Sequence, residues 1–120
     1  MENRADIASI EVIRRQLEAY NRHDALEFAA CYAPEADILD LHTGETILSG
    51  RDAIQARFSK RFEQAGLRVE IVGRMLLPGL VVDSERIFTD ASPEPGAALV
   101  MYEVREGLIR RSWVYRILEG

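Results

Sequence analysis

The spacing of apolar residues changes at Gly66, and this change limits the fold more than any other feature of the chain. Before Gly66, apolar residues recur every three or four positions, which predicts three helices, with a strand hairpin between the second and the third. After Gly66 they alternate, which predicts a four-stranded antiparallel meander. We therefore expect an α+β fold, in which three N-terminal helices pack on one side of a bent antiparallel sheet and leave a conical hollow for a ligand.

The boundaries of these elements follow from capping and turn residues. Asp24 is a predicted N-cap, Pro34 is expected to end the second helix, and Gly73 indicates a bulge in the sheet. The longest predicted loop, at residues 92–96, contains two prolines. The predicted elements are helices at residues 7–20, 25–32 and from 50 to near 66, a hairpin of residues 36–41 and 46–48, and the four strands of the meander. Of these four strands, the first alternates from residue 67, the second follows the turn at residues 78–79 and begins at residue 80, and the last two are residues 97–105 and 108–117.

Composition limits the class of protein and its partners. A chain of 120 residues, 48% hydrophobic, suits a single domain spanning residues 1–120. The net charge of −5 disfavours nucleic acid or an anionic membrane as a partner, because both require a positive surface. No segment resembles a signal peptide or a membrane span, and the single cysteine, Cys31, cannot form an internal disulfide. We expect a cytoplasmic protein.

The first predicted strand contains the leading catalytic candidates, Asp40 and His42. Both share one strand face with Ile38, and an apolar pocket would raise the pKa of a carboxyl group placed there. Asp40 would then serve as a general base, with His42 relaying or orienting the proton. The alternatives are an Asp40 that hydrogen-bonds the hairpin backbone and a His42 exposed at the end of the strand. The two histidines show no metal-ligand spacing, and no cofactor motif is present, so neither a metal nor a cofactor is expected.

Four motifs in order resemble the nuclear transport factor 2-like superfamily, and within it the SnoaL-like and ketosteroid-isomerase-like small proteins. They are YNRHD at the end of the first helix, ADILD before the hairpin, LSGRDAI at the third helix and MYEVREGLIRRSWVYR at the end. The resemblance covers nearly the whole chain. It implies a cone-shaped, cystatin-like α+β fold, a mostly apolar pocket and a homodimer formed through the outer face of the sheet. Members include isomerases, polyketide cyclases, dehydratases, epoxide hydrolases and proteins without catalytic activity, so the fold does not define the function.

The resemblance assigns the position of a ketosteroid isomerase base to Asp40, but the other parts of that site are missing. The position of its tyrosine donor falls on Gln16, and that of its protonated acid falls near Val100. Losing one such donor typically lowers the rate by a factor of ~10²–10³. Steroid isomerisation is therefore not expected unless Gln16, Tyr20 or Tyr102 substitutes, whereas the cyclase relatives are similar in using mainly one carboxylate.

Several further side chains are candidates for lining the pocket, although aromatic residues at helical spacing are commonly plain core. Trp113 is either a wall of the pocket or part of a dimer interface, depending on which face of the last strand points inward. Glu85 and Arg86, in VVDSERIF, are expected to form a solvated or interface pair. The predicted ligand-binding residues are Gln16, Tyr20, Phe58, Phe62, Tyr102 and Trp113.

Two functions remain open from the sequence. The first is a homodimeric protein that holds a small apolar organic ligand and uses Asp40 as acid and base in an isomerase, cyclase or hydratase type of reaction. The second is a ligand-binding or dimerisation module of the same fold without enzymatic activity, which the missing donors favour.

Overall fold

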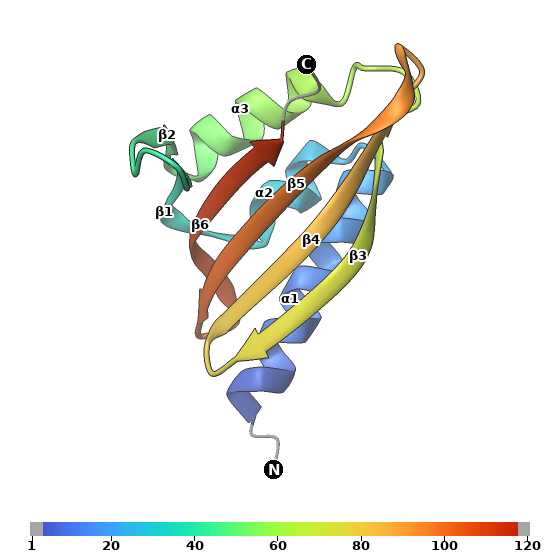
Figure 1. Ribbon diagram of the computed structural model, residues 1–120. Helices are drawn as coiled ribbons and strands as arrows, with labels where there is room; N and C mark the ends of the chain where they lie inside the picture. The colour runs from blue at the N-terminus through green and yellow to red at the C-terminus, as the bar shows by residue number, and fades with distance from the viewer. Residues whose placement is uncertain (1–3, 118–120) are drawn as a thin grey trace.

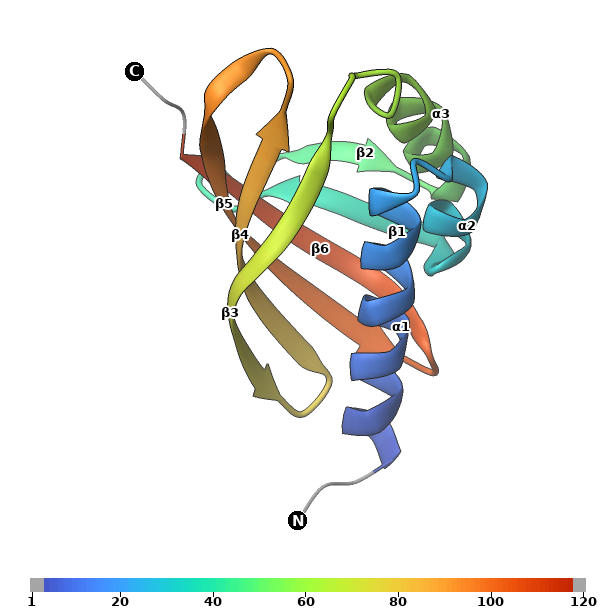
Figure 2. The same cartoon turned by 90° about the vertical axis from the view of Figure 1, so that its right-hand side faces the viewer.

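The computed structural model describes residues 4–117, which form three helices and one six-stranded sheet of order β2-β1-β6-β5-β4-β3. The predicted α+β, cystatin-like fold is confirmed. Figure 1 views the outer face of the strongly bent sheet, and Figure 2 shows the helices gathered on its other side. The elements are α1 (Arg4–Asn21), α2 (Ala25–Ala30), β1 (Tyr32–Asp40), β2 (Thr46–Ser49), α3 (Arg51–Arg61), β3 (Arg68–Leu77), β4 (Leu80–Thr89), β5 (Ser92–Arg105) and β6 (Leu108–Ile117).

Strands β3 to β6 form the predicted antiparallel meander, and the bulge predicted at Gly73 is present. The register of β3 against β4 shifts between Ile71 and Gly73. β1 joins the meander by pairing in parallel with β6, and β2 pairs antiparallel with β1 at the edge. The hairpin of β1 and β2 therefore extends the concave face toward α3.

The second helix is shorter than the sequence pattern predicts, and β1 begins earlier. α2 ends at Ala30 with Cys31 as its C-cap, and Tyr32 already pairs with Ile109 of β6. Pro34 thus lies inside β1 instead of ending a helix. Its missing N–H is tolerated because the pairing of β1 with β6 is interrupted between Tyr32 and Asp37.

The prediction of a loop at residues 92–96 is wrong, because these residues belong to β5. Thr89 pairs with Ser92 and Ile87 with Gly96 of β5. The pairing of β5 with β6 reaches only Ala97, opposite Ile117, so this end of β5 has β4 as its one paired neighbour among the described strands (Figure 1). A strand end with one free side accepts proline, since no ladder hydrogen bond is lost there.

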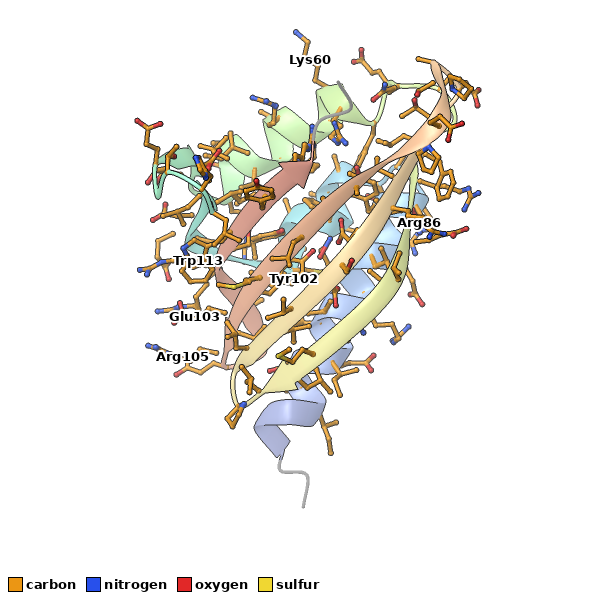
Figure 3. The ribbon with its side chains drawn as sticks, viewed as in Figure 1. Lys60, Arg86, Tyr102, Glu103, Arg105 and Trp113 are labelled. Carbon is orange, nitrogen blue, oxygen red and sulfur yellow. The ribbon has the colours of Figure 1, made fainter. Side chains whose placement is uncertain are left out.

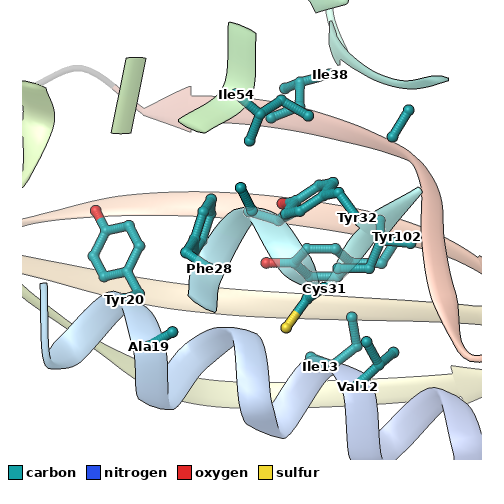
Figure 4. Packing of buried hydrophobic residues seen from close by; sticks show 14 of the residues in the cluster. Val12, Ile13, Ala19, Tyr20, Phe28, Cys31, Tyr32, Ile38, Ile54 and Tyr102 are labelled. Carbon is teal, nitrogen blue, oxygen red and sulfur yellow. The ribbon is translucent and has the colours of Figure 1, made fainter. Parts of the chain in front are cut away.

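The core lies between the concave face of the sheet and the helices (Figure 4). Val12 and Ile13 of α1, Phe28 of α2 and Ile54 of α3 are almost completely buried. Asp24 caps α2 as predicted, with its side chain accepting a 3.0 Å hydrogen bond from the Glu27 N–H. Aromatic rings from the helices fill one end of the core, and the remaining space on the concave face contains the candidate site.

Gly66, which connects α3 to β3, is required by both backbone conformation and space. Its φ is +75°, and a Cβ there would overlap the Asp90 carboxylate and lie 2.9 Å from the Asp90 backbone nitrogen. Gly44 has a similar φ of +78°, but a Cβ at that position would meet no atom within 4 Å. The two glycines therefore share the conformational requirement and differ in crowding.

We expect Gly66→Ala to destabilise the protein more than Gly44→Ala. The left-handed backbone costs about 1–2 kcal/mol in either alanine variant, and the overlap with Asp90 adds at least ~1 kcal/mol at position 66. Urea unfolding of both variants measures the difference. Equal losses of unfolding free energy in the two variants would show that the chain around Asp90 moves to make room for the new Cβ without losing stability.

Candidate functional site

A cavity of about 70 Å³ lies on the concave face of the sheet, enclosed by α1, α2 and α3. Its walls are mostly apolar, with Phe28 and Phe58 from the helices and Val100 and Val114 from the sheet. A volume of this size has room for a few water molecules or a small part of a ligand. The polar groups that reach it define its chemistry, and they come from six different elements.

Glu85 of β4 is the carboxyl group that points into this cavity. Side chains alternate along β4, so Glu85 shares the inward face with the buried Val81 and Asp83. Only 8% of Glu85 is exposed. Burial, and then the negative charge of Asp83, raise the pKa of Glu85 to about 7, although hydrogen bonding to Tyr102 opposes the shift. At neutral pH this carboxyl group is therefore poised both to accept and to donate a proton.

Asp83, two residues earlier on the same strand, is also buried, but an ion pair offsets the cost of burying its carboxyl group. It is 1% exposed and accepts two hydrogen bonds from Arg74, from Nε at 2.6 Å and from Nη2 at 2.9 Å. This bidentate pair places a guanidinium charge directly against the buried carboxyl group. Glu85 has no such ion pair among residues 4–117, so taking up a proton is its way of avoiding an uncompensated buried charge.

Two buried tyrosines lie beside Glu85, and their hydroxyls point the same way in Figure 4. Tyr102 hydrogen-bonds Glu85, and Tyr32 hydrogen-bonds Ser112. Burial, with the charge of Glu85 as a second cause, raises the pKa of Tyr102 well above its ordinary value. Burial likewise raises the pKa of Tyr32. Both phenols therefore remain neutral hydrogen-bond donors at any physiological pH.

Gln16 of α1 contributes a polar group that lacks a partner. The side chain lines the cavity and is 5% exposed, and its Oε1 has no hydrogen-bond partner among the described residues. Leaving such a group unpaired typically costs about 1–3 kcal/mol. A ligand that hydrogen-bonds this amide would recover that free energy.

Tyr20 and Phe58, both predicted to bind a ligand, line the cavity together with Phe28. The Tyr20 hydroxyl accepts a 2.9 Å hydrogen bond from Nε of Arg61, which orients the ring toward the end of α3. Burial raises the pKa of Tyr20 in spite of this neighbouring cation. Of the predicted ligand-binding residues, the structure thus brings Gln16, Tyr20, Phe58 and Tyr102 to one cavity.

Phe62 and Trp113 lie elsewhere. Phe62 is buried behind the cavity wall, packing at 5.1 Å on the Tyr20 ring and stacking on His23. Trp113 belongs to the outer face, because Val114, the next residue along β6, lines the cavity and side chains alternate. Figure 3 views the sheet from this outer side and labels Trp113. The prediction that these two side chains line the pocket is wrong, and for Trp113 the outward alternative holds.

Asp40 does not lie in the enclosed cavity with Glu85. It is partly exposed at the end of β1, where Oδ1 accepts hydrogen bonds from the N–H groups of Thr43 at 2.9 Å and His42 at 2.8 Å. The Thr43 bond first, and the His42 bond after it, lower the pKa of Asp40. The expectation of a raised pKa is therefore wrong, and the structure has the alternative geometry of an acid that closes the hairpin turn.

His42 is exposed, as the alternative prediction for it described, and its ring lies 6.1 Å from that of Tyr115. Among residues 4–117, no three His, Cys, Asp or Glu side chains gather as metal ligands would. Within the same range, no helix combines the length and apolar character needed to cross a membrane.

Sequence reasoning missed Glu85, because two neighbouring charges in VVDSERIF suggest a solvated pair. The available indication was the alternation of the strand, which places residue 85 on the face of Val81 and Ile87. The opposite face also contains apolar residues, Val82 and Phe88, so alternation by itself did not identify the inner face. The packing of α1 on the sheet resolves this choice.

Comparison with known proteins places the chain among structures of the same architecture. Residues 13–112 match the family model described as the SnoaL-like domain. An NTF2-like protein of unknown function from Mesorhizobium loti superposes with a TM-score of 0.83 at 17% identity, covering 98% of each chain. No match is found among curated protein sequences.

Two further solved structures show the range of proteins that share this fold. One is an LEH-like epoxide hydrolase of M. tuberculosis, with a TM-score of 0.77, 14% identity and coverage of 93% of this chain and 84% of that chain. The other, from Catenulispora acidiphila, has a ketosteroid isomerase-like fold and was solved in complex with trimethylamine. It superposes with a TM-score of 0.72 at 15% identity, covering 88% of this chain and 84% of that chain.

We expect the stability of the protein to fall as pH rises from about 4.5 to 7. The pKa of Glu85 is about 7 in the folded chain and has its ordinary value of 4.5 after unfolding, so the folded state binds more protons in this range. The resulting loss is about 3 kcal/mol, complete above pH 7. The Glu85→Gln variant should not lose this stability between pH 4.5 and 7, because it has no carboxyl group at position 85.

The measurement is urea unfolding of the wild type and Glu85→Gln at several values between pH 4.5 and 8. Other titrating groups cancel in the difference between the two proteins. A constant difference across this range would contradict a raised pKa, as would a titration of the Glu85 carboxyl carbon by NMR with a midpoint near 4.5.

Proposed function

We propose, from the premise that this chain belongs to the SnoaL-like domain family, that it catalyses proton transfer on a small, largely apolar organic molecule, with Glu85 as the acid and base. The observation that supports this most is the buried Glu85 carboxyl group, whose pKa of about 7 lies at the pH where a proton is most easily taken and returned. Glu85 replaces Asp40 as the proposed catalytic residue.

The geometry suits removal of a proton from a carbon next to a carbonyl group. The ionised Glu85 would take the proton, and the electron pair of the broken C–H bond would move onto the carbonyl oxygen as an enolate. Once Glu85 is protonated, the single O–H of Tyr102 would turn from Glu85 and donate to that oxygen. Glu85 would then return the proton to a different carbon, which completes an isomerisation or prepares a ring closure.

Gln16 would orient the ligand in this scheme. Its amide presents an acceptor or, after rotation by half a turn, a donor toward the cavity. Tyr32 is held by Ser112 and would support the position of Tyr102 through packing. The mostly apolar walls exclude water, so the few polar contacts act at a low effective dielectric constant.

A binding role without chemistry is the second candidate. The small volume of the cavity favours it, since about 70 Å³ admits only part of most organic substrates. In that case the raised pKa of Glu85 would be a consequence of burial alone. Binding and turnover distinguish the two functions, because a binding protein would retain its ligand unchanged.

We expect Glu85→Gln to lower proton transfer by a factor of ~10²–10⁴ while Asp40→Asn retains nearly all of it. The assay incubates small enolisable ketones with the protein in D₂O and follows the exchange of their α-protons by NMR. The wild-type rate should increase with pH through about 7, because the ionised Glu85 is the base.

Asp40→Asn is the matched control, since it also replaces a carboxylate by an amide in the same fold. Loss of exchange in Asp40→Asn, with Glu85→Gln unaffected, would return the catalytic role to the rim of the site. Ligand binding without any exchange above the rate in buffer would support the second candidate.

The homodimer stays a prediction, and the outer face of the sheet has the composition that it requires. Leu39, Trp113 and Met101 lie in register across β1, β6 and β5 on this face, and the row continues with Val82 and Met75. The Arg111 guanidinium lies 5.8 Å from the centroid of the Trp113 ring. Such a row would become buried if two sheets packed face to face.

We expect Met101→Glu to convert a dimer into a monomer, because the new charge would lie in the middle of the apolar row. Light scattering after size-exclusion chromatography measures the mass. Leu26→Glu is the control, since Leu26 is 68% exposed on α2, away from the outer face. If the wild-type protein has the mass of a monomer at every concentration measured, the proposed dimer does not exist.

A further inference from the structure

A groove of about 240 Å³ adjoins the cavity that contains Glu85. The groove and the cavity share five lining residues, which lie where the two spaces meet: Ile38, Phe58, Arg61, Val114 and Arg116. The groove itself extends over Ile47 and Leu48 of the hairpin. The two spaces are therefore adjacent, and we call the smaller one the inner cavity and the larger one the outer groove.

Three arginines converge on this groove. Arg57 and Arg61 are four residues apart on α3 and so lie on one face of the helix. Arg116 reaches the same groove from β6. Within residues 4–117 none of the three has an ion-pair partner within 4.0 Å, and Arg61 hydrogen-bonds the neutral Tyr20. This local excess of positive charge contrasts with the net charge of −5 of the whole chain.

The electrostatics of Arg116 agree with this arrangement. Partial desolvation, followed by the positive charges of Arg61 and Arg57, lowers the pKa of Arg116, although this side chain is exposed, while Tyr20 and Glu85 act in the opposite direction. Asp40 is the acid on the groove, and both hydrogen bonds to its carboxylate come from the hairpin backbone. Three like charges held close together cost free energy that an anion in the groove would recover.

We propose that the natural ligand is an amphipathic carboxylate, bound through its charged group to Arg57, Arg61 and Arg116, with its apolar end in the inner cavity beside Glu85. This assignment of substrate class rests on the proposed function of Glu85. The planar guanidinium groups match the geometry of a carboxylate. The size of the two spaces supports the orientation, since the inner cavity admits a short apolar end, and the outer groove, which also contains Ile47 and Leu48, admits the carboxylate and the rest of the apolar body.

The test measures binding of phenylacetate and hexanoate by calorimetry, with the uncharged phenylacetamide and hexanamide as matched ligands. Each carboxylate should bind about a hundredfold tighter than its amide, the value of roughly two charge-assisted hydrogen bonds. Arg57→Gln and Arg116→Gln should each weaken carboxylate binding about tenfold and leave amide binding unchanged. These variants avoid Arg61, whose loss would also release Tyr20.

Lys60→Gln is the control for net charge. Lys60 lies on α3 between Arg57 and Arg61, is exposed, and points away from the body of the protein in Figure 3. Its replacement removes one positive charge from the same helix without touching the groove, so carboxylate binding should remain within a factor of about two.

Three results would overturn the proposal. The first is that the amides bind as tightly as the carboxylates, and the second is that Lys60→Gln weakens carboxylate binding as much as Arg116→Gln does. The third is that inorganic phosphate binds as tightly as phenylacetate, which would show that the apolar end contributes nothing to affinity. Failure here is separable from failure of the proposed function. Glu85→Gln would abolish proton exchange whatever the arginines bind, whereas carboxylate binding that depends on the arginines would persist in a protein without catalysis.

Discussion

The alternation of β4 is the constraint on which the site depends. Because Asp83 and Glu85 are two residues apart on one strand, they must share a face, and α1 covers that face. Two unit charges about 7 Å apart repel by roughly 2 kcal/mol at the effective dielectric constant of a protein, and burial adds to this cost. Arg74 compensates Asp83 and a proton compensates Glu85. A single strand thus contains two buried acids, one paired with an arginine and the other with a raised pKa.

Asp40 and Glu85 show why the identity of a residue does not determine its chemistry. Asp40 is followed by a turn whose N–H groups point at its carboxylate, so local structure stabilises the ionised form. Glu85 lies in the middle of a strand, where the backbone N–H groups are used by the neighbouring strands, and its hydrogen bond within residues 4–117 comes from the Tyr102 hydroxyl. The acid with the greater capacity for proton transfer at neutral pH is therefore the one whose own backbone offers no hydrogen bond.

The sequence predicted the features that depend on local interactions. The helix α1, the N-cap at Asp24 and the bulge at Gly73 each depend on a few neighbouring residues, and each is present. The early start of β1 at Tyr32 and the extension of β5 to Ser92 depend on partner strands that are distant in the chain. The inward direction of Glu85 belongs to the same class, because it is defined by which face α1 covers. Tyr102 was predictable because it shares the more apolar face of its strand with Val100 and Val104.

The order of charged groups along the site gives it a direction. Glu85 lines only the inner cavity, Arg61 and Arg116 line both spaces, and Arg57 and Asp40 line only the groove. When Glu85 is ionised, the groove, with three guanidinium groups and one carboxylate, therefore has the greater net positive charge. A neutral or apolar group would cost the least free energy to place in the inner cavity. An anionic group would be more stable in the groove, where water still solvates it in part. Such a gradient orients an asymmetric ligand before any hydrogen bond forms, and it keeps a second negative charge away from Glu85, whose capacity to lose its proton would otherwise be reduced.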